Sequence, residues 1–177
     1  MNIVINPQEV RNEEIRFAFG TCSLDTALVA TSAKGVAALL IGNDRNALRR
    51  ELVSAFPHAR LVADEAGSAD VLTQVVAFLD APREKLKLPL DIRGSAQQQA
   101  VWQALRDVPV GTTVTYGQIA KALPLPATAL DVGAACAANV LAVAIPCHRV
   151  VKADGSISGY RWGVQRKRKL IAREAAA

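Results

Sequence analysis

The sequence predicts an α+β fold, in which a small N-terminal antiparallel sheet with helices precedes a mostly helical C-terminal region. Two patterns predict it. Between residues 15 and 41, three short apolar segments are separated by tight turns, as in an antiparallel meander. From Arg93 onward, apolar side chains recur at helical spacing. The 177 residues, 51% of them hydrophobic, suffice for one globular domain or two small ones, and we place the domains at 1–92 and 93–177.

The N-terminal half is expected to contain three strands and two helices. Residues 1–14 are polar and acidic, so we expect a loose leader there. Asp44 has the position of a helix N-cap, with apolar residues following at helical spacing. We expect strands at 15–19, 26–30 and 36–41, a helix that extends from Asp44 to Phe56, a loop at 57–68, a second helix at 69–79 and an extended segment at 86–92.

The C-terminal half predicts a helix-turn-helix. Ser95 and Gln98 have the spacing of a capping box, and a helix with one apolar face follows them. A short helix at 116–123 ends before a proline, and an alanine-rich helix at 127–140 follows a tight turn. Two short helices in this order are typical of a helix-turn-helix, and a last helix extends to about Glu174.

Composition excludes several classes of protein. Disordered chains are polar and highly charged, whereas 21% of these residues are charged. Three cysteines at irregular spacing argue against a disulfide scaffold and for reduced thiols in a cytoplasmic protein. We interpret Cys22 and Cys136 as structural. The N-terminus shows no signal-peptide pattern, and the longest uncharged apolar run, 132–147, is too short to span a bilayer, so we expect no membrane partner.

Positive charge is concentrated at the C-terminal end. Residues 132–177 hold eight Lys or Arg and two acids, a net charge of +6, whereas residues 1–131 hold thirteen basic and fourteen acidic side chains. Such asymmetry favours a nucleic acid or an anionic membrane as partner. A basic last helix that complements its own dipole would give the same pattern, so charge alone leaves both interpretations open.

Cys147 and His148 are the clearest candidates for chemistry. The thiolate is the reactive form of cysteine, and a neighbouring base or cation increases its population. Adjacent side chains need not face each other, so we consider a bridging water between them and an acid elsewhere that orients the imidazole. For the dipeptide alone, a buried, inert cysteine beside a satisfied histidine is the simpler interpretation.

Several motifs surround this dipeptide. They are Asn139, Pro146-Cys147-His148-Arg149-Val150-Val151, Ser158-Gly159-Tyr160, Val101-Trp102-Gln103-Ala104-Leu105, Val114-Thr115-Tyr116-Gly117 and Tyr160-Arg161-Trp162-Gly163. Together they resemble the signature of the O6-alkylguanine-DNA alkyltransferase family, closest to its bacterial Ada branch. The resemblance extends over 93–174, and residues 15–92 fit the family's N-terminal half in layout, which implies an RNase H-like sheet there.

The resemblance implies a suicide DNA-repair protein that needs neither cofactor nor metal. Cys147 would accept a methyl or other alkyl group from O6-alkylguanine, with O4-alkylthymine as a second candidate substrate. His148 would activate the thiol through water, Glu174 would hold the histidine, and Asn139 would brace the turn that carries the cysteine.

The implied partner is double-stranded DNA, bound by a monomer that places the helix at 127–140 in the minor groove. Tyr116 would press on the phosphate 3′ to the target and help turn the nucleotide out, which a buried thiol requires because the O6 substituent lies within the base stack. Val150, Tyr160 and the backbone near Arg161 would line the guanine pocket. Further DNA-contacting candidates are Thr115, Gln118, Ala129, Leu130, Ala135 and Arg149.

Three places depart from the family pattern. Leu130 stands where the family usually has an arginine that fills the gap left by the flipped base, Pro124-Leu125-Pro126 replaces a glycine-containing turn, and Gln97 replaces a common phenylalanine. Two alternatives therefore stay open: a module that binds damaged DNA without repairing it, and a regulatory protein with weakened DNA binding. Cys147 argues against the first, and Leu130 favours the second.

Overall fold

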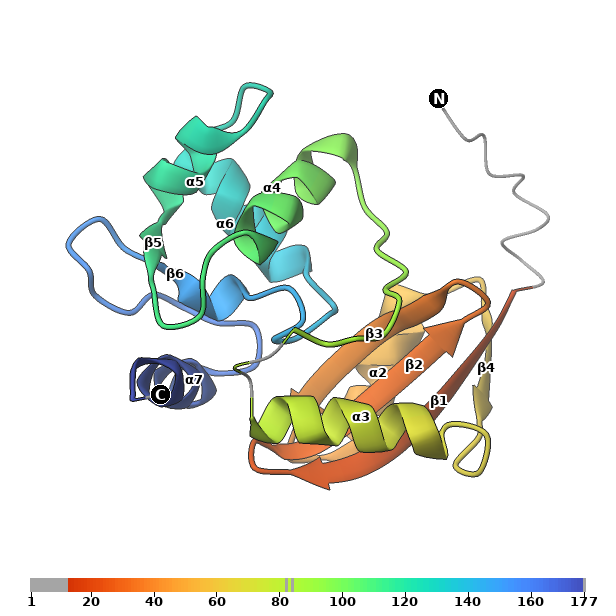
Figure 1. The fold of residues 1–177 in the computed structure, drawn as a ribbon. Coiled ribbons are helices and arrows are strands. Elements are labelled where there is room, and N and C mark those ends of the chain that lie inside the picture. The colour runs from red at the N-terminus through yellow and green to blue at the C-terminus, as the bar shows by residue number, and fades with distance from the viewer. Residues whose placement is uncertain (1–12, 82, 84, 177) are drawn as a thin grey trace. The chain divides into compact units, whose positions relative to one another are not determined.

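The computed structural model describes residues 13–81, 83 and 85–176 (Figure 1). These residues cluster into two compact units. The first consists of the described residues of Met1–Asp80 with Lys87–Asp91, and the second of the described residues of Ala81–Leu86 with Ile92–Ala177. Within the described part of the chain, no helix combines the length and the apolar character that a membrane crossing requires.

The first unit is built on a four-stranded mixed sheet in the order β3-β2-β1-β4. The predicted meander is confirmed for the first three strands, which pair antiparallel. The predictions of a wholly antiparallel sheet and of a loop at 57–68 are wrong, because β4 lies in that segment and pairs parallel to β1. The strands are β1 (Glu14–Cys22), β2 (Asp25–Ser32), β3 (Gly35–Gly42) and β4 (Arg60–Ala63).

β4 carries little sequence signal because it is a four-residue edge strand with no fully buried side chain. Its position depends on pairing with a distant segment. The Arg60 amide donates to the Glu13 carbonyl over 2.7 Å, and the Asp64 amide donates to the Phe17 carbonyl over 2.9 Å. Tertiary pairing therefore created a strand that local periodicity could not predict.

Two helices cover opposite faces of this sheet, α2 (Arg45–Ala55) behind it and α3 (Ala69–Asp80) in front in Figure 1. The Arg45 guanidinium lies 5.1 Å from the centre of the Phe19 ring in β1. A Cβ on the next residue, Gly20, would lie 2.8 Å from the Leu72 side chain of α3. Since successive strand residues point to opposite faces, β1 contacts both helices. Burial on both sides also explains the unbroken apolar run in β3.

Local signals in this unit act as predicted. The Asp44 carboxylate caps α2 by accepting the Asn46 amide over 2.8 Å. The segment predicted as extended after residue 86 reaches β3, where the Val36 amide donates to the Pro89 carbonyl over 2.9 Å. Gly35 permits this contact, since it has a φ of 141° and a Cβ there would lie 2.3 Å from the Pro89 oxygen.

The second unit is mostly helical, and three of its helices begin with capping boxes. The predicted box of Ser95 and Gln98 is present, and Thr128 and Asp131 form another. α5 and α6 pack against each other as the predicted helix-turn-helix. The elements are α4 (Ala96–Arg106), β5 (Val114–Thr115), α5 (Tyr116–Ala122), α6 (Ala129–Ala138), the one-turn 3₁₀ helix η1 (Cys147–Arg149), β6 (Val150–Val151) and α7 (Val164–Ala175).

The core of this unit fixes α6 and the segment that follows it. Trp102 of α4 is buried, and its indole N–H donates to the Ala135 carbonyl over 2.9 Å. After α6 the chain turns through η1 into β6, which pairs parallel to β5. α7 packs against η1. The turn between α6 and β6 is thereby held on several sides.

Candidate active site

Cys147 lies at the start of η1, directly after Pro146, and is 4% exposed. The turn before it is strained, because Val143 adopts a φ of 65°, a conformation that β-branched residues rarely take. Such a backbone persists only where its surroundings hold it. Asn139 supplies that support.

Asn139 is the C-cap of α6 and is fully buried. Its side-chain oxygen accepts the Leu141 amide over 2.8 Å. Its side-chain nitrogen donates to the Ile145 carbonyl over 3.1 Å and to Cys147 Sγ over 3.3 Å. One amide therefore spans the turn and also supplies a hydrogen-bond donor to the candidate nucleophile.

His148, Arg149 and Glu174 form a buried charged cluster. His148 Nε2 lies 2.6 Å from Glu174 Oε1. Arg149 Nε donates to Glu174 Oε2 over 2.9 Å, and another guanidinium N–H donates to the Val108 carbonyl over 2.8 Å. The other ring nitrogen, Nδ1 of His148, is buried without a hydrogen-bond partner among the described residues. Nδ1 is thus the nitrogen left to take up a proton.

The electrostatics of the site leave the thiol and the imidazole neutral at rest. Burial raises the pKa of the Cys147 thiol well above its ordinary value, against the opposing effects of Asn139 and Lys167. Burial lowers the pKa of His148, against the effect of Glu174. Burial would raise the pKa of Glu174, but hydrogen bonds from His148 and Arg149 outweigh it and lower this pKa to about 2. The site therefore pairs a neutral thiol and a neutral base with a permanent carboxylate.

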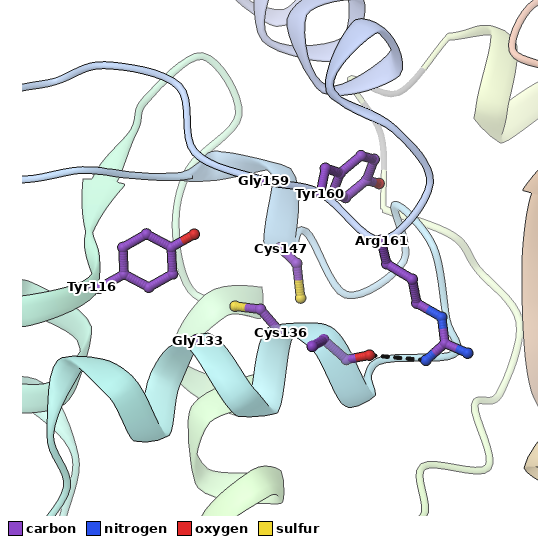
Figure 2. A pocket seen from close by; sticks show the side chains of 8 residues that line it. Tyr116, Gly133, Cys136, Cys147, Gly159, Tyr160 and Arg161 are labelled. Carbon is purple, nitrogen blue, oxygen red and sulfur yellow. Dashed lines mark hydrogen bonds between the residues drawn. The ribbon is translucent and has the colours of Figure 1, made fainter.

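A cavity of about 300 Å³ lies beside the Cys147 sulfur (Figure 2). Ligand pockets in proteins begin at about this size. The structure brings together there three residues predicted to bind substrate, Tyr116, Tyr160 and Arg161. Arg161 also donates to the Ala137 carbonyl over 2.9 Å, which ties its loop to the end of α6. The lining consists of Tyr116, Gly133, Cys136, Ala137, Cys147, Gly159, Tyr160 and Arg161.

Val150, predicted to bind the guanine, holds the base of this site rather than its wall. Val150 is fully buried in β6 and is absent from the cavity wall. Its carbonyl instead accepts Nζ of the buried Lys167 over 2.6 Å. Lys167 also donates to Ser158 Oγ over 2.9 Å, and Ser158 Oγ lies 2.5 Å from the Tyr116 hydroxyl. A hydrogen-bonded chain therefore connects α7, the loop before it and α5.

Sequence reasoning missed Lys167, because four of its neighbours in the same helix are also basic and nothing local marks it as buried. Cys136, interpreted from the sequence as structural, lines the cavity, which that interpretation did not anticipate. A signal existed for Cys136. It precedes Asn139 by three residues at the end of a helix, so the two share one side of it.

Of the predicted DNA-contacting residues, Ala135 and Arg149 are not available to a partner. Ala135 is 3% exposed, and its carbonyl is taken by Trp102. Arg149 is 7% exposed and its guanidinium is bound within the protein by Glu174 and Val108. Both pack into the core of the unit, which argues against a direct contact of either side chain with DNA.

The remaining DNA-contacting candidates lie near the surface. Thr115 and Gln118 form the capping box of α5. Ala129 is exposed, and Leu130 is 86% exposed. Leu130, Ala134 and Ala137 form one exposed stripe of α6, which ends at the cavity. Small side chains along this stripe would let another backbone approach the helix closely.

Among the described residues, no group of His, Cys, Asp or Glu is arranged to hold a metal ion.

Comparison with known proteins identifies the family. The model of the 6-O-methylguanine DNA methyltransferase DNA-binding domain matches residues 96–176. The inducible methylated-DNA–protein-cysteine methyltransferase of Bacillus subtilis is 36% identical over 122 residues, which cover 69% of this chain and 68% of that protein. The chain belongs to the O6-methylguanine-DNA methyltransferase family. The resemblance seen in the sequence is thereby confirmed.

Other members of the O6-methylguanine-DNA methyltransferase family extend the comparison. The Escherichia coli bifunctional transcriptional activator/DNA repair enzyme Ada is 48% identical over 164 residues, 93% of this chain but 46% of that protein. The chain thus spans about half the length of this relative. The crystal structure of Mycobacterium tuberculosis O6-methylguanine methyltransferase matches with a TM-score of 0.74 at 27% identity, covering 92% of this chain and 93% of that one. The same protein in complex with DNA gives 0.72 at 28% identity. The α+β fold is that of these structures.

Proposed function

We propose that this chain repairs DNA by transferring the alkyl group of O6-alkylguanine to Cys147, once and irreversibly. The observation that carries the proposal is a buried thiol on a cavity wall, with Asn139 donating to its sulfur and the His148–Glu174 pair following it. The names of the Bacillus subtilis and Escherichia coli relatives support the same reaction. O4-alkylthymine is a second candidate substrate.

The reaction needs a proton to leave a thiol that is neutral at rest. His148 takes this proton at Nδ1 through a bridging water, while Glu174 stabilises the imidazolium that forms. The sulfur then attacks the alkyl carbon. The S–C bond forms as the C–O6 bond breaks, the electron pair stays on guanine, and guanine recovers a proton at N1. The thioether has no easy hydrolytic exit, so one molecule repairs one base.

The target base must leave the duplex to reach this thiol. The exposed stripe of α6 supports placement of this helix in the minor groove of double-stranded DNA, with Ala129 and Leu130 at the base stack. Thr115, Tyr116 and Gln118 at the start of α5 would contact the backbone, with Tyr116 pressing on the phosphate 3′ to the target. Exposed cations of α7 would add non-specific attraction to phosphates.

Two further properties belong to the proposal. The candidate residues all come from one unit of one chain, which supports action as a monomer. The three cysteines are free thiols, which supports a cytoplasmic location.

The test is alkyl transfer from duplex DNA that contains O6-methylguanine. The peptide with Cys147 should gain the mass of a methyl group in place of a proton. Cys147→Ser should abolish the gain but retain most DNA affinity, because a serine hydroxyl forms no accessible anion near neutral pH. Transfer by the serine variant at the wild-type rate would show that another residue is the acceptor.

A second candidate function is regulation or damage recognition with weak or no transfer. The observation that favours it is Leu130, which is 86% exposed where the family usually has an arginine. The same assay separates the two. Tight binding to methylated duplex without a mass change at Cys147 would support this candidate and contradict the first.

A further inference from the structure

The cavity contains a second thiol that the proposed alkyl transfer does not use. Cys136 belongs to α6 and Cys147 to η1, and both line the cavity. In Figure 2 the Cys147 side chain points toward α6, from which the Cys136 side chain enters the same cavity. A hydrogen bond between the two thiols acts on the pKa of each. Asn139 fixes the two walls relative to one another, because it ends α6 and bonds both Ile145 and Cys147.

The two thiols differ in reactivity. Cys136 is half-buried, whereas Cys147 is buried. Interaction with the Cys147 thiol lowers the pKa of Cys136 in spite of burial, and the Lys167 charge acts in the same direction. Burial raises the pKa of Cys147. Cys136 is therefore the more ionised and more accessible thiol, which are the two properties that favour attack on a peroxide.

Other polar groups surround the pair from several elements. Tyr116 comes from α5, Tyr160 from the loop before α7, and Lys167 from α7 itself. The pKa of Tyr160 is raised well above its ordinary value by burial, so its ring stays neutral beside the thiols. Among the residues that the structure describes, Lys167 is the cation that acts on both sulfurs.

We propose that Cys136 and Cys147 form an oxidation site, at which hydrogen peroxide converts the two thiols into a reversible disulfide. The Cys136 thiolate attacks one peroxide oxygen, and protonation of the leaving hydroxide gives a sulfenic acid and water. The Cys147 sulfur then attacks the sulfenic sulfur, the S–O bond breaks, and the second water leaves with the thiol proton. Two thiols lose two electrons and two protons, and one peroxide becomes two waters.

The disulfide has a definite chemical consequence. The disulfide protects the Cys147 sulfur from further, irreversible oxidation to a sulfinic acid, and an added dithiol restores both thiols. Its formation rests on the two cysteines alone. The consequence for repair rests on the proposed function, since a Cys147 held in a disulfide cannot accept an alkyl group.

The experiment treats the reduced full chain with stoichiometric hydrogen peroxide in the absence of DNA. Remaining thiols are blocked with an alkylating reagent, and the peptides are weighed. We expect a cross-linked species that joins the Cys136 and Cys147 peptides within one chain and lacks two hydrogens. One of the three thiols should remain titratable, and dithiothreitol should restore the other two.

Two variants make the outcome specific. Cys22→Ser removes the cysteine of the first unit and should oxidise like the wild type. Cys136→Ser should form no intramolecular cross-link and should leave Cys147 either unmodified or irreversibly oxidised. Folding of each variant is checked by the rate at which the alkylating reagent blocks Cys147, measured from peptide masses. In a folded variant this rate should be lower in native buffer than in denaturant.

The proposal is overturned if peroxide oxidises Cys147 to a sulfinic acid while Cys136 stays free, or if the only disulfides involve Cys22 or a second chain. Methyl transfer is measured separately on reduced protein. If the disulfide forms but the reduced protein transfers no methyl group, the proposed function is contradicted and the oxidation site stands. If the reduced protein transfers methyl groups but no disulfide forms, the proposed function stands and the oxidation site is contradicted.

Discussion

The two units use charged side chains in opposite ways. In the first, ion pairs lie along the exposed edge of the sheet, where Arg16 and Arg60 contact Glu14 and Asp64. In the second, Arg149, Lys167 and Glu174 are each at most 7% exposed. Exposed pairs add little to stability because solvent screens them, whereas a buried charge that loses its partner is costly. Charged side chains in the second unit therefore organise a site, whereas those in the first unit mainly lie on the exposed edge of the sheet.

The largest effect is expected from Glu174→Ala. The substitution leaves His148 and Arg149 buried without their carboxylate, so the second unit should lose about 3–5 kcal/mol of unfolding free energy. The rate of alkyl transfer should fall as well. Both tryptophans, Trp102 and Trp162, belong to this unit, so urea denaturation followed by tryptophan fluorescence reports on it directly.

The matched change in the first unit is Glu14→Ala, which removes a carboxylate from the exposed edge. Hydrogen exchange of the β1 amides should show little or no change. If Glu14→Ala destabilised β1 as much as Glu174→Ala destabilises the second unit, the distinction between the two units would be wrong.

The pH dependence of the second unit should have two phases. The pKa of His148 is lowered on folding, so its contribution is fully present above its unfolded pKa of about 6.5 and declines as pH falls. The pKa of Glu174 falls from 4.5 to about 2, so its contribution is present above pH 4.5 and is lost as pH falls toward 2. The second phase should amount to about 2–3 kcal/mol. Fluorescence-monitored unfolding between pH 8 and pH 2 measures both, and persistence of the lower phase in Glu174→Gln would exclude this assignment.

Lys167→Met tests the wall of the cavity. Methionine keeps the apolar stem but removes the donors to Val150, Ser158 and Gly159, so unfolding free energy should fall by about 2 kcal/mol. Transfer should slow by more than about tenfold, because the loop that carries Tyr160 loses its anchor. Lys169→Met is the control, since Lys169 is exposed on the same helix. If both substitutions lowered stability and slowed transfer equally, the positive charge of the helix, and not the cavity wall, would be responsible.

The smallest effect is expected from Leu130→Arg. Stability should change by no more than about 0.5 kcal/mol, because the side chain is 86% exposed. Transfer from duplex DNA should accelerate roughly threefold or more, since arginine can fill the gap that base flipping leaves and bond the orphaned partner base. Single-stranded DNA has no orphaned base and should gain less. The measurement is the second-order rate on both substrates at two salt concentrations, and an equal gain on both would remove Leu130 from the flipping gap.

The sequence by itself determined the features that depend on neighbours along the chain. The meander, the Asp44 cap and the Ser95–Gln98 capping box are set by residues within a few positions of one another, so local periodicity and spacing were enough to predict them. The motif around Cys147 identified the family for the same reason, since it is nearly contiguous.

Only the tertiary structure decided what depends on distant partners. β4 exists because β1, more than 40 residues earlier, offers it an edge, and Arg149 is withdrawn from the surface because Glu174, 25 residues later, binds it in the core. The same packing buries Lys167 beside the exposed Arg168 and Lys169 and turns Cys136 into the cavity beside Cys147. Burial and pairing are properties of the assembled core, and a sequence of similar lysines or small helical residues does not distinguish which of them it will enclose.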